Sequence, residues 1–277
     1  MSFPRPVALF LVLAILVACA PAEENLAVVA NAPGTFEAGQ TQRLLVGLVD
    51  PETSAYLASP EVAAVGELTA PDGTESEVDA IFMWTVPDVR GLYRIDQTFD
   101  QVGEWWVRLR AEGLGPTPKS AFTVIADGPL PGPGDPAVAV PTRTAAEYPI
   151  DEISSDDEPD PSFYETSLDA ALQNGLPTIV VFATPAFCAS QTCGPMLDQV
   201  KAAAREHPDA NYIHVEIYNN LDAASTADLV VNPAVTAWGL PSEPWVFVID
   251  GSGNVAARFE GALSSDELEA ALEAVGA

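Results

Sequence analysis

The chain has 277 residues, with 40 acidic and 11 basic side chains and a formal net charge of −29. This excess of negative charge argues against nucleic-acid binding, because phosphates would be repelled, and against a polybasic hold on anionic lipid head groups. Three cysteines are too few for a disulfide scaffold and two histidines too few for a histidine-rich zinc site, whereas 48% hydrophobic residues suffice for a packed core.

The first residues have the pattern of a secretory signal. Arg5 supplies one positive charge, and an apolar run extends from Val7 to Ala18, shorter than the roughly 20 residues of a membrane-spanning helix. The run ends at Cys19 in the sequence Leu-Val-Ala-Cys, which resembles the lipobox of bacterial lipoproteins. The resemblance implies a signal peptide over residues 1–18, a lipid on Cys19 that anchors the protein to a membrane, and an extracytoplasmic place in the cell envelope. Ordinary cleavage after Ala20 is the alternative.

Residues 19–126 contain short β-rich runs between turn signals. In Glu104–Arg110, alternation places Trp105, Val107 and Leu109 on one face, which we expect to be the core. Several short strands in about 100 residues predict an all-β, immunoglobulin-like sandwich. The predicted strands are Leu26–Ala30, Arg43–Val49, Ala64–Thr69, Val78–Met83, Leu92–Phe99, Glu104–Arg110 and Ala121–Ile125.

Residues 127–162 are predicted to form a linker. The segment contains eight prolines and the acid-rich stretch Asp151–Glu158. Proline stiffness and charge repulsion both favour an extended tether over a packed element.

From residue 163 to residue 277, strands and helices alternate. The apolar strand Pro177–Phe182 is typical of a buried central position. The alternation, with a terminal hairpin, predicts an α/β sheet of mixed strand directions. Further strands are predicted at Asn211–Ile217, Trp245–Ile249 and Val255–Glu260, and helices at Ser167–Asn174, Cys193–Glu206, Pro233–Trp238 and from Ser264 or Ser265 to Val275.

Three segments of residues 163–277 resemble the thioredoxin-fold family in order and spacing. The stretch from Phe182 through Cys188 to Cys193-Gly-Pro corresponds to the family's strand, cysteine and helix. The segment after Trp238 leads to the family's cis-proline, which falls on Pro244, and Gly261 to Leu268 matches the start of its last helix. The resemblance implies a thioredoxin-like fold and thiol–disulfide exchange with a protein or small-molecule substrate, in which Cys188 and Cys193 react and Pro244 lies against the active cysteine. It implies no cofactor.

The active-site region departs from the family's Cys-x-x-Cys. Met196 stands where the second cysteine is expected, and Cys188 instead precedes Cys193 by five positions. On one helix this pair would point roughly 140° apart. We therefore expect Cys188 in the loop and Cys193 at or near the helix start, where the helix dipole lowers a thiol pKa. Val181 occupies the position at which thioredoxins usually carry a buried acid, and the sequence leaves open which cysteine attacks.

Three alternative functions remain open. The stretch from Thr184-Pro185 to Cys193-Gly resembles peroxiredoxins of the bacterioferritin-comigratory type, with one extra residue before Cys188, and implies a peroxidase. Cys188, Cys193 and Met196 are soft ligands suited to Cu(I), which envelope thioredoxin-fold proteins of the Sco family bind, with His214 as a conceivable further ligand. The two cysteines could also form a structural disulfide in a domain that only binds partners.

Overall fold

The computed structural model describes residues 27–31, 36–50 and 52–277. The predicted signal peptide and Cys19 lie outside these residues. Within the described ranges, every helix is too short or too polar to span a bilayer.

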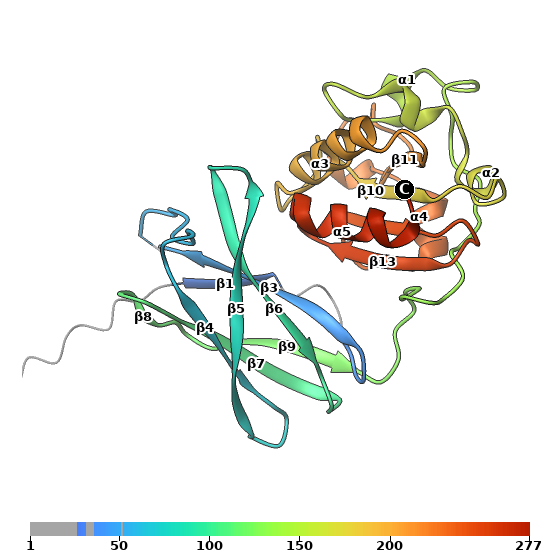
Figure 1. Cartoon of the computed structure of the whole chain (residues 1–277). Coiled ribbons are helices and arrows are strands. Elements are labelled where there is room, and N and C mark those ends of the chain that lie inside the picture. Colours follow the sequence, from blue (N-terminus) through green and yellow to red (C-terminus); the bar gives the residue numbers. More distant parts are fainter. Residues whose placement is uncertain (1–26, 32–35, 51) are drawn as a thin grey trace, which may run out of the picture.

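In the part of the chain that the structure describes, nine strands form the N-terminal domain (Figure 1). Their order is β1-β3-β6-β5-β4-β7-β9-β2, with β8 beside β7. The long strand β5 links the two parts of this sheet, because its first half pairs with β4 and its second half pairs with β6. The strands are β1 (Ala27–Asn31), β2 (Phe36–Glu37), β3 (Thr41–Val49), β4 (Ala64–Thr69), β5 (Glu75–Val86), β6 (Arg90–Thr98), β7 (Gly103–Ala111), β8 (Gly115–Pro116) and β9 (Ser120–Ile125).

The alternation of apolar residues fixes which face of each strand packs inward. In β7, Trp105, Val107 and Leu109 are buried, whereas Trp106 is 37% exposed. Rings of Phe36 and Phe99 pack 5.2 Å apart in the same core. The predicted β-sandwich is thereby confirmed, and the two shortest strands, β2 and β8, are the ones that the sequence pattern does not reveal.

The C-terminal domain contains a sheet of order β11-β10-β12-β13. Strand β10 runs parallel to β11 and antiparallel to β12, and β12 forms a hairpin with β13, so the predicted mixed sheet is confirmed. Its elements are η1 (Pro161–Tyr164), α2 (Leu168–Ala171), β10 (Thr178–Ala183), α3 (Cys193–Glu206), β11 (Asn211–Glu216), η2 (Thr226–Asp228), α4 (Pro233–Trp238), β12 (Trp245–Ile249), β13 (Val255–Glu260) and α5 (Ser265–Val275).

The central strand β10 is buried along its whole length because helices cover both faces of the sheet (Figure 1). Ile179 and Val181 point to the face covered by α3 and α5, and Val180 and Phe182 to the face covered by α2 and α4. A fully apolar strand is therefore required here, as its sequence indicates.

The segment 127–162 lies against the C-terminal domain and does not extend away from it. Leu130 is buried in the core on the α2 and α4 face, and Ile153, in the short helix α1 (Ile150–Ile153), is buried on the other face. The backbone also pairs with the start of β13, since the Gly134 amide donates to the Val255 carbonyl at 2.8 Å. The few apolar residues between the prolines therefore pack on the domain, although the overall composition of the segment does not predict this.

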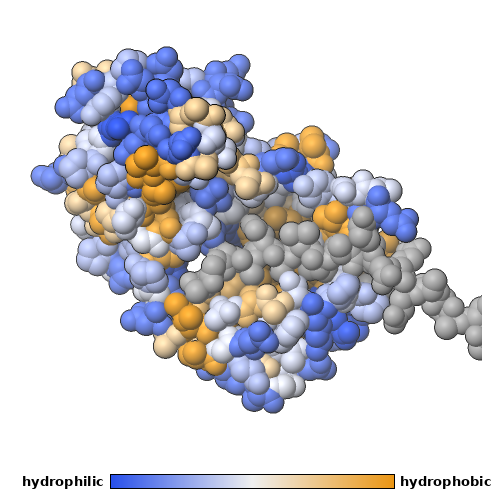
Figure 2. Space-filling view, turned by 180° about the vertical axis from the view of Figure 1, so that it is seen from behind, coloured by the Kyte–Doolittle hydropathy of each residue, from blue (hydrophilic) through white to orange (hydrophobic). Residues whose placement is uncertain are grey.

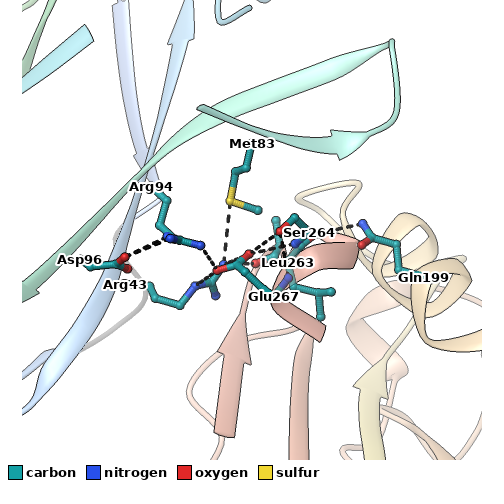
Figure 3. A network of polar contacts seen from close by, with 9 residues as sticks. Arg43, Met83, Arg94, Asp96, Gln199, Leu263, Ser264 and Glu267 are labelled. Carbon is teal, nitrogen blue, oxygen red and sulfur yellow. Dashed lines mark hydrogen bonds and ion pairs between the residues drawn. The ribbon is translucent and has the colours of Figure 1, made fainter. Parts of the chain in front are cut away.

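Ion pairs join the two domains (Figure 3). Glu267, in the first turn of α5, accepts from Arg43 Nε at 2.7 Å and lies 2.8 Å from an Arg94 nitrogen. A second pair links Arg258 of β13 to Glu37 of β2 at 3.1 Å. Away from these contacts, hydrophilic residues cover much of the visible surface of both domains, as expected from the acidic composition (Figure 2).

Candidate active site at the Cys188–Cys193 disulfide

A disulfide joins the loop after β10 to the first residue of α3. Cys188 lies in the loop and Cys193 begins the helix, with their Cα atoms 6.1 Å apart, inside the usual range for a disulfide. This is the placement that the five-residue spacing predicts. The helix starts there because Gly194 and Pro195 follow, and proline is well tolerated in a first turn whose amides lack intrahelical partners.

The two sulfur environments differ. Cys193 is fully buried in the core under α3, whereas Cys188 is only half-buried at the edge of that core. The Cys193 amide donates to Cys188 Sγ at 3.3 Å, and Ser190 Oγ lies 3.3 Å from the same sulfur. Cys188 is therefore the sulfur that an external group can reach.

The electrostatic setting favours a thiolate at this position. The positive end of the α3 dipole meets the disulfide, and the first turn of α3 contains no acidic residue. One amide of the helix start is already directed at Cys188 Sγ. Amides and a helix N-terminus both stabilise negative charge, so this position suits a thiolate after reduction.

Pro244 lies at the same end of the sheet as the disulfide loop. The Glu243–Pro244 peptide bond is cis, as the resemblance implies. Phe182 of β10 is paired with Trp245 of β12, so the residue before Trp245 stands opposite the end of β10, where the loop to Cys188 begins. The sheet register thus brings Pro244 and the cysteine loop together.

A second wall of the site comes from the loop after β11. The Phe187 ring contacts the Tyr218 ring edge-on, with centroids 6.1 Å apart. Burial raises the pKa of Tyr218, and the nearby carboxylates of Glu243 and Glu216 raise it further. Burial likewise raises the pKa of Glu243, the residue before Pro244. Phe187, the residue before Cys188, therefore packs on a tyrosine that has carboxylates nearby.

A buried polar group lies beside the position of the missing acid. Val181 is fully buried, and its partner across the sheet is His214. His214 Nε2 is 3.1 Å from the Ala183 carbonyl, to which it donates, and Nδ1 is 2.7 Å from the Tyr164 hydroxyl. Burial lowers the pKa of His214, so the imidazole is neutral at pH 7. Both ring nitrogens have hydrogen-bond partners within the protein.

The residues proposed for Cu(I) do not form an open ligand set in this state. The sulfurs of Cys188 and Cys193 are bonded to each other, and Met196 is buried in the core. His214 uses both ring nitrogens within the protein. Elsewhere in the described residues, Glu206, His207 and Glu269 lie within 4.8 Å of one another, at the far end of α3 from Cys193.

Residues 164–276 match the family model described as a thioredoxin-like domain. The C-terminal part of the chain is a thioredoxin-like domain. The match supports an oxidoreductase-like enzyme, and it does not extend to residues 1–163. No curated protein sequence matches the chain.

Solved structures resemble each domain separately. One similar structure is dsbF of MTB, which is 19% identical, covers 40% of this chain and 89% of its own length, and has a TM-score of 0.32. Another is a thiol:disulfide interchange protein of the thioredoxin family from Chlorobium tepidum TLS, which is 20% identical, covers 50% of this chain and 99% of its own length, and has a TM-score of 0.30. A filamin domain of Lin-41 also matches (17% identity, 39% and 98%, TM-score 0.27). At these scores the likeness is not evidence of a shared function.

The sequence pattern missed the contacts that distinguish the two sulfurs. Ser190 stands two residues after Cys188, where a hydroxyl can turn back onto the sulfur, and this spacing is visible in the sequence. The buried trio of Ser154, Tyr164 and His214 has no such signal, because its members come from three separate elements.

Proposed function

We propose that the C-terminal domain catalyses thiol–disulfide exchange through Cys188 and Cys193, with Cys188 as the sulfur that reacts with substrate. The observation that carries this proposal is the asymmetry of the pair: Cys188 is accessible and accepts two polar contacts, whereas Cys193 is buried at the helix start. An accessible thiolate stabilised by a helix N-terminus is the form in which cysteine reacts.

The reaction is a pair of sulfur exchanges. A substrate thiolate attacks Cys188 Sγ, the Cys188–Cys193 bond breaks, and Cys193 leaves as a thiolate while a mixed disulfide forms. The second substrate thiolate then attacks the first substrate sulfur, which is bonded to Cys188 in the mixed disulfide. This forms the substrate disulfide and releases Cys188 as a thiolate. Two electrons pass from the dithiol to the protein, and the two protons lost by the substrate thiols are balanced by those that the two cysteines take up. The reverse sequence reduces a substrate disulfide.

Pro244 is proposed to shape the surface against which the substrate lies. The register of β10 and β12 supports this role, because it sets Pro244 at the sheet end where the cysteine loop starts. Cys19 is proposed as a lipid-bearing anchor that places both domains outside the cytoplasm. The lipobox-like sequence supports the anchor, and an intact disulfide fits an oxidising compartment.

Thiol trapping tests the assignment of the two cysteines. In Cys193→Ser, Cys188 should form a mixed disulfide with an oxidised dithiol peptide, and the mixed disulfide should persist once the thiol freed on the peptide is alkylated, because Cys193 is no longer there to resolve it. The matched variant Cys188→Ser should trap little, because Cys193 is buried. Equal trapping by the two variants, or trapping by Cys188→Ser alone, would contradict the assignment.

A redox titration of the full chain separates exchange from a structural disulfide. We expect a reduction potential above about −300 mV, since exchange-competent disulfides lie above that value and structural ones below it. A pair that stays oxidised well below that potential would favour the structural reading. Rapid sulfenic acid formation with hydrogen peroxide would instead favour the peroxidase alternative.

A further inference from the structure

The β5–β6 hairpin of the sandwich lies beside the start of α3 (Figure 1). The side chain of Gln199 bridges the domains, because its Nε2 donates to the Thr85 carbonyl at 3.3 Å and to the Leu263 carbonyl at 2.9 Å. A cavity of about 10 Å³ is lined jointly by the hairpin residues Thr85, Val86 and Arg90 and by Thr192, Pro195, Met196 and Gln199. The N-terminal domain therefore adjoins the residues that flank Cys193.

Arg90, at the start of β6, differs from most cations of the protein. Seven of the ten Lys and Arg residues in the described ranges form ion pairs, and Arg90 is not among them. Its guanidinium lies instead over the Tyr56 ring, 4.8 Å from the centroid. Tyr56 is 51% exposed and Val89 is 73% exposed, so an apolar surface borders this charge.

We propose that the β5–β6 hairpin is part of the substrate-binding surface, and that Arg90 binds a carboxylate close to the reacting cysteine of a polypeptide. This inference rests on the proposed exchange function. Charge complementarity supports it: the chain has 40 acids and 11 bases, and Arg90, which forms no ion pair within the described residues, lines a cavity together with Thr192 and Pro195 on either side of Cys193.

The geometry favours a polypeptide over a small disulfide. The reactive sulfur belongs to one domain and the patch of Tyr56, Val89 and Arg90 to the other. A substrate bound at Cys188 must be extended to contact the hairpin of the other domain, and an extended polypeptide, which advances about 3.3 Å per residue, has that shape. Its carboxylate meets Arg90 and its apolar side chains meet Tyr56 and Val89.

The test compares two dithiol peptides that differ only in a Glu or a Lys a few residues from the first cysteine. Each peptide reduces the disulfide of the full chain, and the rates are measured by acid quenching and alkylation at 0.15 M salt, where the Debye length of about 8 Å screens distant charges. We expect the ratio of the Glu-peptide rate to the Lys-peptide rate to fall about fivefold or more in Arg90→Glu, the size expected for one partly exposed ion pair.

Arg205→Glu is the matched control. It makes the same charge change at the exposed last turn of α3, about 18 Å along the helix axis from Cys193 at 1.5 Å per residue. The rate ratio should match that of the wild type. Dithiothreitol, which has neither the Glu nor the Lys of the peptides, should reduce all three proteins at similar rates.

Each other outcome is decisive. If Arg90→Glu keeps the wild-type ratio while all proteins react, the hairpin inference fails and the exchange function stands. If Arg90→Glu changes the dithiothreitol rate or the reduction potential equally, Arg90 acts on the disulfide and not on the substrate, which also overturns the inference. If the wild type reacts with neither peptide nor dithiothreitol, the exchange function itself fails.

Discussion

Glu267 is the residue whose replacement should most clearly weaken the junction between the domains. Its carboxylate faces Arg43 and Arg94, and the side chains of all three residues are no more than 22% exposed. The same carboxylate closes the capping box of α5 by accepting from the Ser264 amide at 2.9 Å. Two functions of one carboxylate can be separated, because glutamine also serves in a capping box.

The magnitude follows from the two environments. Surface ion pairs contribute up to about 1 kcal/mol, and breaking a buried pair costs about 3–5 kcal/mol, so this half-buried pair of contacts should contribute about 2 kcal/mol. A helix cap adds about 1 kcal/mol. Burial lowers the pKa of Arg43, which shows that its charge is poorly solvated and depends on Glu267. We expect Glu267→Gln to lower the free energy of unfolding by about 2 kcal/mol and Glu267→Ala by about 3 kcal/mol.

Urea unfolding, followed by tryptophan fluorescence, measures these differences without added salt. Glu273→Gln is the control, because Glu273 is exposed on the same helix. Burial opposes ionisation of Glu267, but the Arg43 charge, the Ser264 amide and Arg94 together lower its pKa. Its contribution is therefore complete above the ordinary pKa of 4.5 and is lost as the pH falls through the lower folded value. A Glu267→Gln protein as stable as Glu273→Gln at pH 7 would refute this reasoning.

Three further predictions concern single residues. Tyr164→Phe should lower the free energy of unfolding by about 1–3 kcal/mol, because His214 Nδ1 loses its hydroxyl partner in the core, and thermal denaturation would reveal it. Burial raises the pKa of Glu260 to about 7, so ionisation of this group destabilises the fold as the pH rises from 4.5 to 7. Glu260→Gln should remove that loss of stability. A variant whose urea midpoint falls with pH as the wild type's does would contradict this prediction. After reduction, iodoacetamide should label Cys188 before Cys193, which peptide mapping can check, and preferential labelling of Cys193 would count against the exposure difference.

The sequence by itself determined the domain types and most elements. The period-two pattern of β7 indicates a strand with one buried and one exposed face. The continuous apolar run of β10 indicates a strand that is covered on both faces. The Cys-x4-Cys spacing also fixed one cysteine in the loop and one at the helix start, because a single helix cannot present both on one side.

Only the tertiary structure decided how distant residues meet. Leu130 and Ile153 are isolated apolar residues in a proline- and acid-rich segment, and nothing local shows that they are buried. Arg90 approaches the active-site helix because contacts such as those of Glu267, more than 170 positions away in the chain, hold the two domains against each other. Such contacts depend on the geometry of packed surfaces, which local periodicity does not encode, and they give the disulfide its neighbours.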